Sequence, residues 1–409
     1  MVQSRLIALG CAFAALGACS APQAQSDAPA SLDDIIKAEA NPQYTVPGAA
    51  LAVAVSGEIV WTEVAGTAHF GDDQLTPETA LTSKTRVRAA SMSKLVTALT
   101  AYELAQQGVV DLDENILPIL GYDPRGDGAS ISLRQLFAHT SGVCDPEVYW
   151  APLGARLAAL FEQPSPCDYA PDGGWTYANI NFGLAAEVME HRTGERFDQL
   201  ASRLVLEPAG LSARFNWSEM DADEKMSNGG SLFRWIDGVW QVQIDGRESL
   251  QDPEPSILRQ DDRPLEAYEP GSNGTLFSPQ GGLRASVEEL AILSGLFRPD
   301  RAGAELAVPV WTGLVDPGVT AWGTGPQILI PGQIPGYPEL SLVGHSGEAY
   351  GLYGGTWSFT ECPVSFAFFV NGTDPTADAS RDLVTGQTYW EDQLLRRVMP
   401  VALSYCDTE

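Results

Sequence analysis

Positive charge is scarce in this sequence of 409 residues, in which 24 lysines and arginines face 53 aspartates and glutamates. The formal net charge is −29 at pH 7. A surface this acidic repels phosphate backbones and anionic bilayers, so we expect neither nucleic-acid binding nor electrostatic contact with a membrane. Solubility is the ordinary role of such an excess of one charge. No Cys-x-x-Cys spacing occurs, so nothing supports a metal or redox site, and no cofactor is expected.

Long hydrophobic runs are also lacking. The apolar run at the N-terminus, Leu6 to Ala18, follows the positive charge of Arg5 and is too short to span a bilayer, which takes about 20 residues. Residues 1–18 are therefore predicted to be a signal peptide. Residues 19–30 are rich in Ala, Ser, Pro and Gln, which is typical of a flexible tether.

The predicted signal ends in Leu16-Gly17-Ala18-Cys19, which resembles the lipobox of bacterial lipoproteins. The resemblance implies that Cys19 is lipidated and begins the mature protein. We therefore expect an exported, periplasmic protein that reaches the membrane only through a lipid anchor in the outer membrane. A plain secretory peptide, cleaved to release a soluble protein, is the alternative.

Four cysteines remain after the signal, and an even number in an exported protein favours disulfides. Four cysteines allow three pairings. Chain order favours Cys144 with Cys167 and Cys362 with Cys406, because each of these pairs is local. Other pairings and buried free thiols stay open.

Strand patterns lie near both ends of the sequence, and helical patterns fill the middle. Apolar runs of strand length occupy 48–55, 59–64, 341–343, 353–359 and 365–370, and a hairpin is expected at 233–242. Helical spacing follows Ser91 and returns at 31–40, 133–138, 155–161, 182–191, 286–297 and 387–398. We expect an α+β fold: an antiparallel sheet from the N- and C-terminal segments, flanked by helices, with an inserted, mainly helical subdomain. One domain would cover 31–409, with its α/β part at 31–120 and 280–409 and its insert at 121–279.

The segment Ser91-Met92-Ser93-Lys94 is a Ser-x-x-Lys at the start of a predicted helix. Residues three apart share a helix face, so the Lys94 amine can lie beside the Ser91 hydroxyl. An amine of lowered pKa can take the serine proton and create a nucleophile. Only four lysines occur, and only Lys94 has a serine three residues before it. A capping serine followed by a solvated lysine is the plainer interpretation of this motif alone.

Two further motifs follow along the chain. Tyr177-Ala178-Asn179 is the only Tyr-x-Asn, and its tyrosine can relay a proton while its amide binds the substrate or Lys94. His345-Ser346-Gly347 precedes a strand pattern and can line a cleft with an imidazole, a hydroxyl and bare backbone. Each motif alone has a structural explanation, but the three in this order favour a catalytic cleft.

The three motifs together resemble those of the serine β-lactamase and penicillin-binding-protein superfamily, especially its class C-like branch. That branch includes class C β-lactamases, D-alanyl-D-alanine carboxypeptidases, D-aminopeptidases and some esterases. The resemblance extends over nearly all of Pro47 to Gly372. It includes Arg88-Ala89-Ala90, the segment Ser132 to Gly142 and the segment Gly281 to Ser286. On that ground His139 and Ser141 are expected to be structural.

The resemblance implies a role for each residue of the first two motifs. Ser91 is expected to be acylated. Lys94 and Tyr177 would share the general-base and general-acid work, and Asn179 would position the substrate.

The third motif takes the place of the family's Lys-Thr-Gly. His345 and Ser346 would face the substrate, and the N–H groups of Ser91 and of Glu348, after Gly347, would form the oxyanion hole. Histidine in place of lysine is more frequent among carboxypeptidase- and esterase-like members, so β-lactamase activity is expected to be weak or absent. Because imidazole titrates near neutrality, we expect His345 to produce an activity limb between about pH 6 and 7.5.

The expected protein is a monomeric serine hydrolase acting on an amide or ester in a small molecule or peptide, as a D-alanyl-D-alanine carboxypeptidase or an esterase does. A catalytically silent cell-wall-binding or scaffold protein on the same fold is the alternative of a different class. An α/β-hydrolase is disfavoured. The stretch from Gly344 to Glu348 nearly forms Gly-x-Ser-x-Gly, but its last glycine is misplaced and no histidine follows residue 345.

Overall fold

The computed structural model describes residues 31–38, 42–218, 220–250, 265–315, 318–377, 381–382 and 386–406. The predicted signal peptide, the tether and Cys19 lie outside the described residues. Among the residues described, no helix combines the length and the apolar character that crossing a membrane requires.

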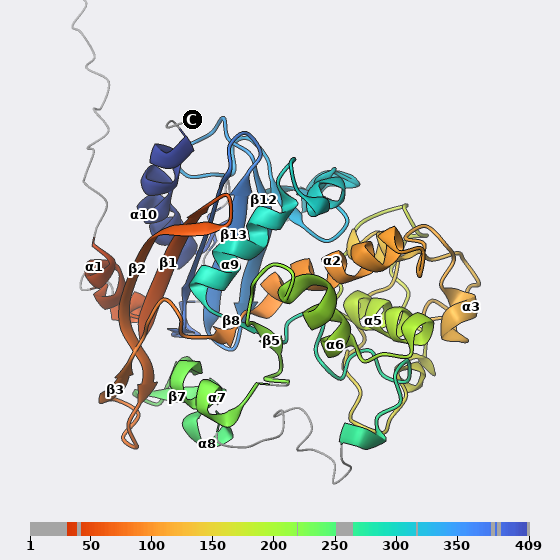
Figure 1. Ribbon diagram of the computed structural model, residues 1–409, viewed down its shortest axis with the longest axis horizontal. Helices are drawn as coiled ribbons and strands as arrows, with labels where there is room; N and C mark the ends of the chain where they lie inside the picture. The colour runs from red at the N-terminus through yellow and green to blue at the C-terminus, as the bar shows by residue number, and fades with distance from the viewer. Residues whose placement is uncertain are drawn as a thin grey trace, which may run out of the picture.

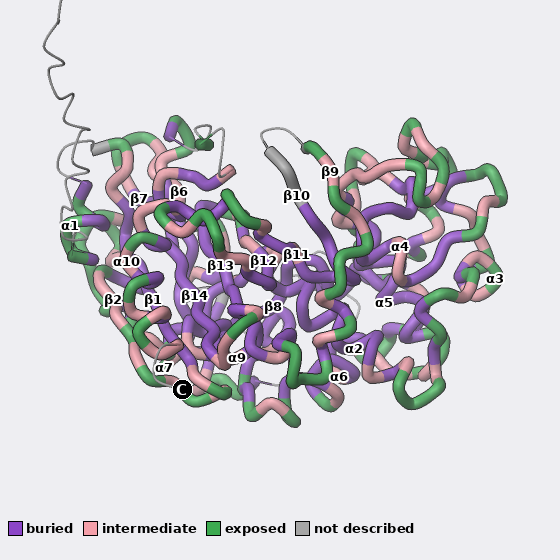
Figure 2. Tube along the Cα trace, turned by 90° about the horizontal axis from the view of Figure 1, so that it is seen from above, coloured by how far each residue is buried: buried purple, intermediate pink, exposed green. Residues whose placement is uncertain are grey.

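The centre of the fold is a nine-stranded antiparallel sheet with the order β3-β2-β1-β14-β13-β12-β11-β10-β9 (Figure 1). Strand β1 pairs with β2 on one side and with β14 on the other, so the N- and C-terminal segments meet in the middle of the sheet. The central strands β1, β13 and β14 are buried along nearly their whole length (Figure 2). The strands are β1 (Gly48–Val55), β2 (Glu58–Phe70), β3 (Pro77–Ala80), β9 (Trp311–Val315), β10 (Gly318–Trp322), β11 (Gln327–Leu329), β12 (Leu342–Ala349), β13 (Leu352–Phe359) and β14 (Val364–Val370).

Helices cover both faces of this sheet. Successive side chains of a strand point to opposite faces, and β1 follows this rule with apolar residues on both. Leu51 and Val53 pack in one cluster with α1 (Leu32–Lys37) and α10 (Tyr389–Cys406). Ala50 and Ala52 belong to the larger cluster on the other face, with α9 (Val287–Ser294) and the helical half of the molecule. These two layers confirm the predicted α+β fold.

The helical half of the molecule, which includes α2 and α5, lies beside the sheet (Figure 1). It contains α2 (Ser93–Gln106), α3 (Leu117–Leu120), α4 (Leu133–Phe137), η3 (Leu157–Phe161), α5 (Ile180–Thr193) and α6 (Phe197–Ala201). The predicted helix at 155–161 is therefore a shorter 3-10 helix. The segment 121–279 is also not uniformly helical, because the predicted hairpin forms β6 (Leu232–Ile236) and β7 (Val239–Ile244). Strand β6 pairs with β15 (Gly372–Thr373) in parallel.

A second small sheet joins the two halves, with the order β4-β8-β5. Its strands are β4 (Val87–Arg88), β5 (Arg214–Phe215) and β8 (Leu283–Ala285), and the helices α7 (Ala222–Asn228) and α8 (Arg247–Leu250) lie near β7 (Figure 1). Because β4 ends just before Ser91, this sheet anchors the backbone that carries the serine.

Both predicted disulfides are present, with Cα–Cα separations of 5.4 Å for Cys144–Cys167 and 5.5 Å for Cys362–Cys406. The first closes a loop between α4 and α5. The second ties the turn between β13 and β14 to the last residue of α10.

Candidate active site

Ser91 lies in a short 3-10 turn, η2 (Ala90–Met92), which leads directly into α2. Its neighbour Ala90 has φ +47°, a left-handed conformation that costs a residue with a side chain about 1–3 kcal/mol. The Ser93 hydroxyl holds the turn by donating to the Ala90 carbonyl at 2.6 Å. Strand β12 packs closely against the same turn, because a Cβ at Gly347 would lie 2.9 Å from the Ala89 carbonyl oxygen. The surrounding structure therefore imposes the position of Ser91.

The Lys94 amine is completely buried and donates to three oxygens. These are Ser91 Oγ at 3.0 Å, Asn179 Oδ1 at 2.9 Å and the Gln280 carbonyl at 3.0 Å. None of the three is charged. Burial lowers the pKa of Lys94 to about 7, and the distant charge of Asp145 opposes this only partly. At neutral pH a large fraction of Lys94 is therefore the free amine.

Tyr177 provides the second contact to the nucleophile, and its hydroxyl donates to Ser91 Oγ at 2.7 Å. Burial raises the pKa of Tyr177 well above its usual value, so the phenol keeps its proton. The ring stacks on His139 at a centroid distance of 4.5 Å, and His139 Nδ1 accepts from the Ala178 N–H at 3.1 Å. His139 thus holds the Tyr177 loop in place, in agreement with the structural role expected for it.

A cavity of about 340 Å³ lies in front of Ser91. Three residues of the first two motifs, Ser91, Tyr177 and Asn179, lie on its wall, and Lys94 lies behind Ser91. The other lining residues are Arg88, Ala90, Tyr149, Gln280, Gly281, Glu348, Ala349 and Tyr350. The structure therefore brings together, at one cavity, groups from η2, the start of α5, the loop before β8 and the end of β12.

The family model for beta-lactamase matches residues 27–387 of this chain. The chain belongs to the beta-lactamase family. This membership confirms the family resemblance that the three motifs predict, and it places the chain among serine hydrolases and transferases.

Among curated relatives of this beta-lactamase family member is an ML-236A carboxylate methylbutanoyltransferase from Penicillium citrinum, which is 28% identical over 50% of this chain and 56% of its own length. A D-aminopeptidase from Brucella anthropi is 29% identical over 41% of this chain and 32% of its own length. A D-alanyl-D-alanine-carboxypeptidase/endopeptidase from Escherichia coli is 28% identical over 31% of this chain and 35% of its own length. The chain thus spans about half or less of the length of these relatives.

Solved structures show the same fold. A D-amino acid amidase from Ochrobactrum anthropi SV3 matches with a TM-score of 0.63 and 18% identity, over 91% of this chain and 99% of its own. A penicillin-binding protein homologue from Pyrococcus abyssi matches with a TM-score of 0.62 and 18% identity, over 88% of this chain and 74% of its own.

The third motif of this family member lies inside β12, whereas the sequence predicts that it precedes a strand. His345 is only 1% exposed, and its ring meets Trp322 edge-on at 5.2 Å and lies 6.3 Å from Tyr177. Burial, and then the charge of Lys94, lower the pKa of His345 to about 3. Burial beside Trp322 therefore opposes the expectation that His345 titrates near neutrality, because it disfavours the charged imidazole.

Neither His345 nor Ser346 lines the cavity in front of Ser91. The Ser346 hydroxyl donates to Gln327 Oε1 at 3.2 Å on the neighbouring strand β11. Glu348 does line the cavity, but its carboxylate accepts from the Tyr353 hydroxyl at 2.8 Å and from Arg381. The carboxylate of Glu348 is therefore already occupied.

Asp145 is a residue of this site that the motifs do not reveal. Its carboxylate accepts from Asn179 Nδ2 at 3.1 Å and from the Ile180 N–H at 2.8 Å. These bonds cap α5 and turn the oxygen of Asn179 toward Lys94. The only signal in the sequence is that Asp145 follows Cys144, whose disulfide holds the loop.

Proposed function

We propose that this protein is a serine hydrolase that forms an acyl-enzyme on Ser91 with an amide or ester substrate. The observation that carries the proposal is the set of three oxygens around Lys94. The Asn179 oxygen and the Gln280 carbonyl can only accept hydrogen bonds. When Lys94 loses a proton, its two remaining N–H groups stay on these oxygens and its lone pair faces the Ser91 hydroxyl.

The reaction begins when Lys94 takes the Ser91 proton and Ser91 Oγ attacks the carbonyl carbon of the substrate. The oxyanion of the tetrahedral intermediate would be stabilised by the backbone N–H groups of Ser91 and Glu348. As the bond to the leaving group breaks, the leaving group takes a proton from Tyr177, and the proton held by Lys94 replaces it. Water then attacks the ester, its proton returns to the same pair, and the acid leaves with Ser91 restored.

The substrate class is proposed from the relatives and from His345. Peptidases and amidases occur among the similar proteins, which supports an activity like that of a D-alanyl-D-alanine carboxypeptidase or an esterase. Because His345 is a neutral, buried side chain at the position of the family's lysine, weak or absent β-lactamase activity is proposed. Transferases are also among the relatives, and the same acyl-enzyme would serve an alcohol acceptor in place of water. A catalytically silent scaffold is disfavoured by the contacts of Ser91 with Lys94 and Tyr177.

We also propose that the mature protein is a monomer held at the periplasmic side of the outer membrane by a lipid on Cys19. The two disulfides support an oxidising compartment. Mass spectrometry of the mature N-terminus from cells tests this, and an unlipidated, freely released form would contradict it.

The experiment for the catalytic proposal is intact-mass analysis of the protein quenched during turnover of p-nitrophenyl acetate, together with burst kinetics. We expect a mass increase of one acetyl group, located on Ser91, and its loss in Ser91→Ala. The matched control is Ser227→Ala, because Ser227 is an exposed serine of α7 outside the cavity. If Ser91→Ala acylates at the wild-type rate, the proposal is wrong.

A further inference from the structure

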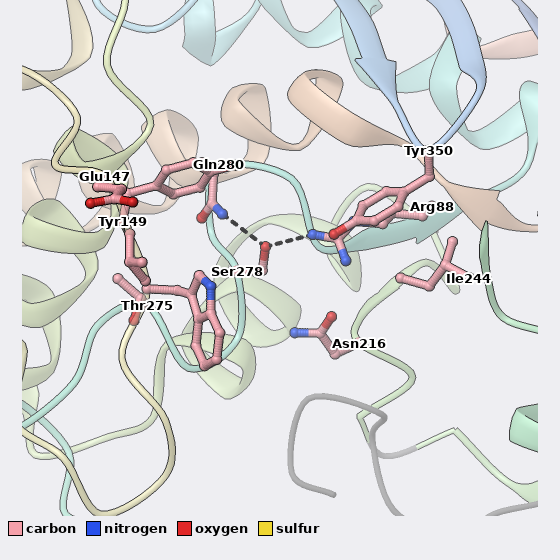
Figure 3. Close-up of a pocket in the computed structure, with 11 residues that line it drawn as sticks. Arg88, Glu147, Tyr149, Asn216, Ile244, Thr275, Ser278, Gln280 and Tyr350 are labelled. Carbon is pink, nitrogen blue, oxygen red and sulfur yellow. Dashed lines mark hydrogen bonds between the residues drawn. The ribbon is translucent and has the colours of Figure 1, made fainter. Parts of the chain in front are cut away.

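A second cavity of about 370 Å³ adjoins the one in front of Ser91. The two share four wall residues: Arg88, Tyr149, Gln280 and Tyr350. Figure 3 shows this second cavity, with Arg88 on one side and Glu147 on the other. A substrate held at Ser91 can therefore extend from the first cavity into the second along these four residues.

The charged group of this second cavity is the Arg88 guanidinium. Its Nε donates to the Gly281 carbonyl at 2.8 Å and its Nη2 to Ser278 Oγ at 2.9 Å, while the Tyr350 ring lies 4.9 Å from its Cζ. A guanidinium has five N–H groups, so three remain without an acceptor among the described residues. In the described part of the chain, no carboxylate forms an ion pair with Arg88.

Asn216 contributes an unused donor to the same wall. It is only 1% exposed, and its Oδ1 accepts from Arg284 Nη1 at 2.8 Å. Because a guanidinium can only donate, this bond fixes the amide so that Nδ2 lies on the other side. That nitrogen faces the cavity (Figure 3) and has no hydrogen-bond partner among the described residues.

Ser278 supplies a third donor between Arg88 and Gln280. Its Oγ already accepts from Arg88 and, at 3.0 Å, from Gln280 Nε2, as the dashed lines in Figure 3 mark. The hydroxyl proton is therefore free to donate into the cavity. Asn216 and Ser278 both have positive φ, +48° and +52°, and the structure maintains this strain where the two donors meet the cavity.

The positive charges of Arg88 and Arg284, near these three donors, exceed the negative charge of Asp245. Arg284 is fully buried and forms a bidentate pair with Asp245, with both distances at 2.9 Å. Asp245 pairs with Arg284 alone, so the positive charge of Arg88 has no carboxylate partner among the described residues. Glu147 is exposed on the far side of the cavity (Figure 3) and contacts none of the donors. In a protein whose net charge is −29, the wall formed by the half-buried Arg88 and the buried Asn216 and Ser278 is a local region of positive charge.

The part of the substrate that reaches this wall follows from the position of Tyr177. The leaving group must take its proton from Tyr177 and so lies against that residue, which is not part of the second cavity. The acyl part extends from the opposite side of the reacting carbonyl, and Arg88, which lines both cavities, is on the wall that it can reach. We propose that Arg88, Asn216 and Ser278 bind a carboxylate at the end of the acyl part, so that this protein prefers acyl groups that carry a terminal negative charge. The inference rests on the proposed function.

The test compares p-nitrophenyl esters that differ only in that carboxylate: the mono-esters of glutaric and adipic acid against the valerate and hexanoate. Hydrogen bonds to charged groups are strong enough that we expect kcat/KM to favour one of the carboxylated esters by about 10- to 100-fold. Equal or lower kcat/KM for both carboxylated esters would overturn the inference.

The decisive variant is Asn216→Asp, which keeps the oxygen for Arg284 but replaces the inward N–H groups with a negative oxygen. The preference for the carboxylated ester should fall to about onefold or reverse. The matched control is Asn115→Asp, because Asn115 is exposed and uses only its oxygen, toward Leu117 and Ile131 N–H groups. The control should keep the wild-type ratio, which shows that an added charge elsewhere is not the cause.

Competition on the wild-type protein keeps the inference testable if Asn216→Asp does not fold. Free glutarate should inhibit turnover of the neutral valerate ester at least about tenfold more strongly than glutaramide. Equal inhibition, or a preference that Asn216→Asp leaves unchanged, overturns the inference while the acyl-enzyme on Ser91 stands. Loss of all acylation of Ser91 by both esters would instead refute the proposed function.

Discussion

Lys94 in α2 and Arg284 in β8 both have completely buried basic side chains, yet their hydrogen-bond partners differ. Arg284 meets the carboxylate of Asp245 with two hydrogen bonds. Lys94 meets only neutral oxygens. A buried charge is costly unless it is paired. A guanidinium cannot escape this cost by losing its proton, whereas an amine can.

The difference distinguishes Arg284, which stabilises the fold, from Lys94, which can take part in the reaction. The Arg284–Asp245 pair links β8 to the end of β7 through two hydrogen bonds. Lys94 has no direct counter-ion, so burial lowers its pKa to about 7 and makes it a base under ordinary conditions. The proposed chemistry therefore depends on Lys94 having neutral oxygens, and no carboxylate, as its hydrogen-bond partners among the described residues.

The variant Lys94→Met tests the chemical side of this comparison and has the largest expected effect. Methionine fills a similar volume without an amine, so positioned proton transfer is lost and acylation of Ser91 should slow by about 10²–10⁴-fold. Pre-steady-state release of p-nitrophenol measures this rate. Because Lys94 forms no ion pair with a described residue that the variant would break, the melting temperature should fall much less than on loss of the Arg284–Asp245 pair. A strongly destabilised variant, or one that acylates at the wild-type rate, would contradict the comparison.

The variant Asp245→Asn tests the structural side. It leaves the Arg284 charge buried without a carboxylate, which should lower the free energy of unfolding by about 3–5 kcal/mol. Urea denaturation followed by circular dichroism measures the loss. The control is Asp113→Asn, because Asp113 pairs with Arg134 at the surface and such pairs contribute about 0–1 kcal/mol. Equal losses in the two variants would show that the buried pair has no special role.

The sequence predicts those parts of the site that depend on neighbours a few residues apart. Ser91 and Lys94 face each other because of helical spacing, and Tyr177 and Asn179 lie together because only one residue separates them. The strand that contains Leu51 and Val53 likewise follows from a local apolar run of strand length. The Ser-x-x-Lys and Tyr-x-Asn motifs therefore reach the same cavity with the contacts that they suggest.

The remaining features depend on tertiary contacts that no local pattern contains. Asp145 is one of 53 acidic residues, and only folding brings it to Asn179. Gln280 acts on Lys94 through its backbone carbonyl, which every residue possesses. The unused donors of Asn216 become visible only once Arg284 is seen to occupy its oxygen. The pKa of His345 depends on burial beside Trp322, and the sequence places these two residues in separate strands.

The smallest expected effect concerns the pH dependence of acylation. It tests whether Lys94 or His345 is the group whose titration controls the rate. Acylation requires the free amine of Lys94, so its rate should rise as the pH increases through about 7 and level off above. The imidazole of His345 has a pKa of about 3 and is already neutral throughout that range. Its Nδ1 lies 2.6 Å from the Ser346 carbonyl and must be the protonated nitrogen, because a carbonyl can only accept.

His345→Asn should therefore leave the midpoint of this pH dependence unchanged. The acylation rate itself should change, because the asparagine amide packs less well against Trp322. The measurement is the acylation rate of p-nitrophenyl acetate between pH 5.5 and 9, corrected for spontaneous hydrolysis. His191→Asn is the matched control, since it removes an exposed imidazole at the C-terminal end of α5. If the limb disappears in His345→Asn and persists in the control, His345 is the titrating group, and the free amine of Lys94 does not account for the pH dependence.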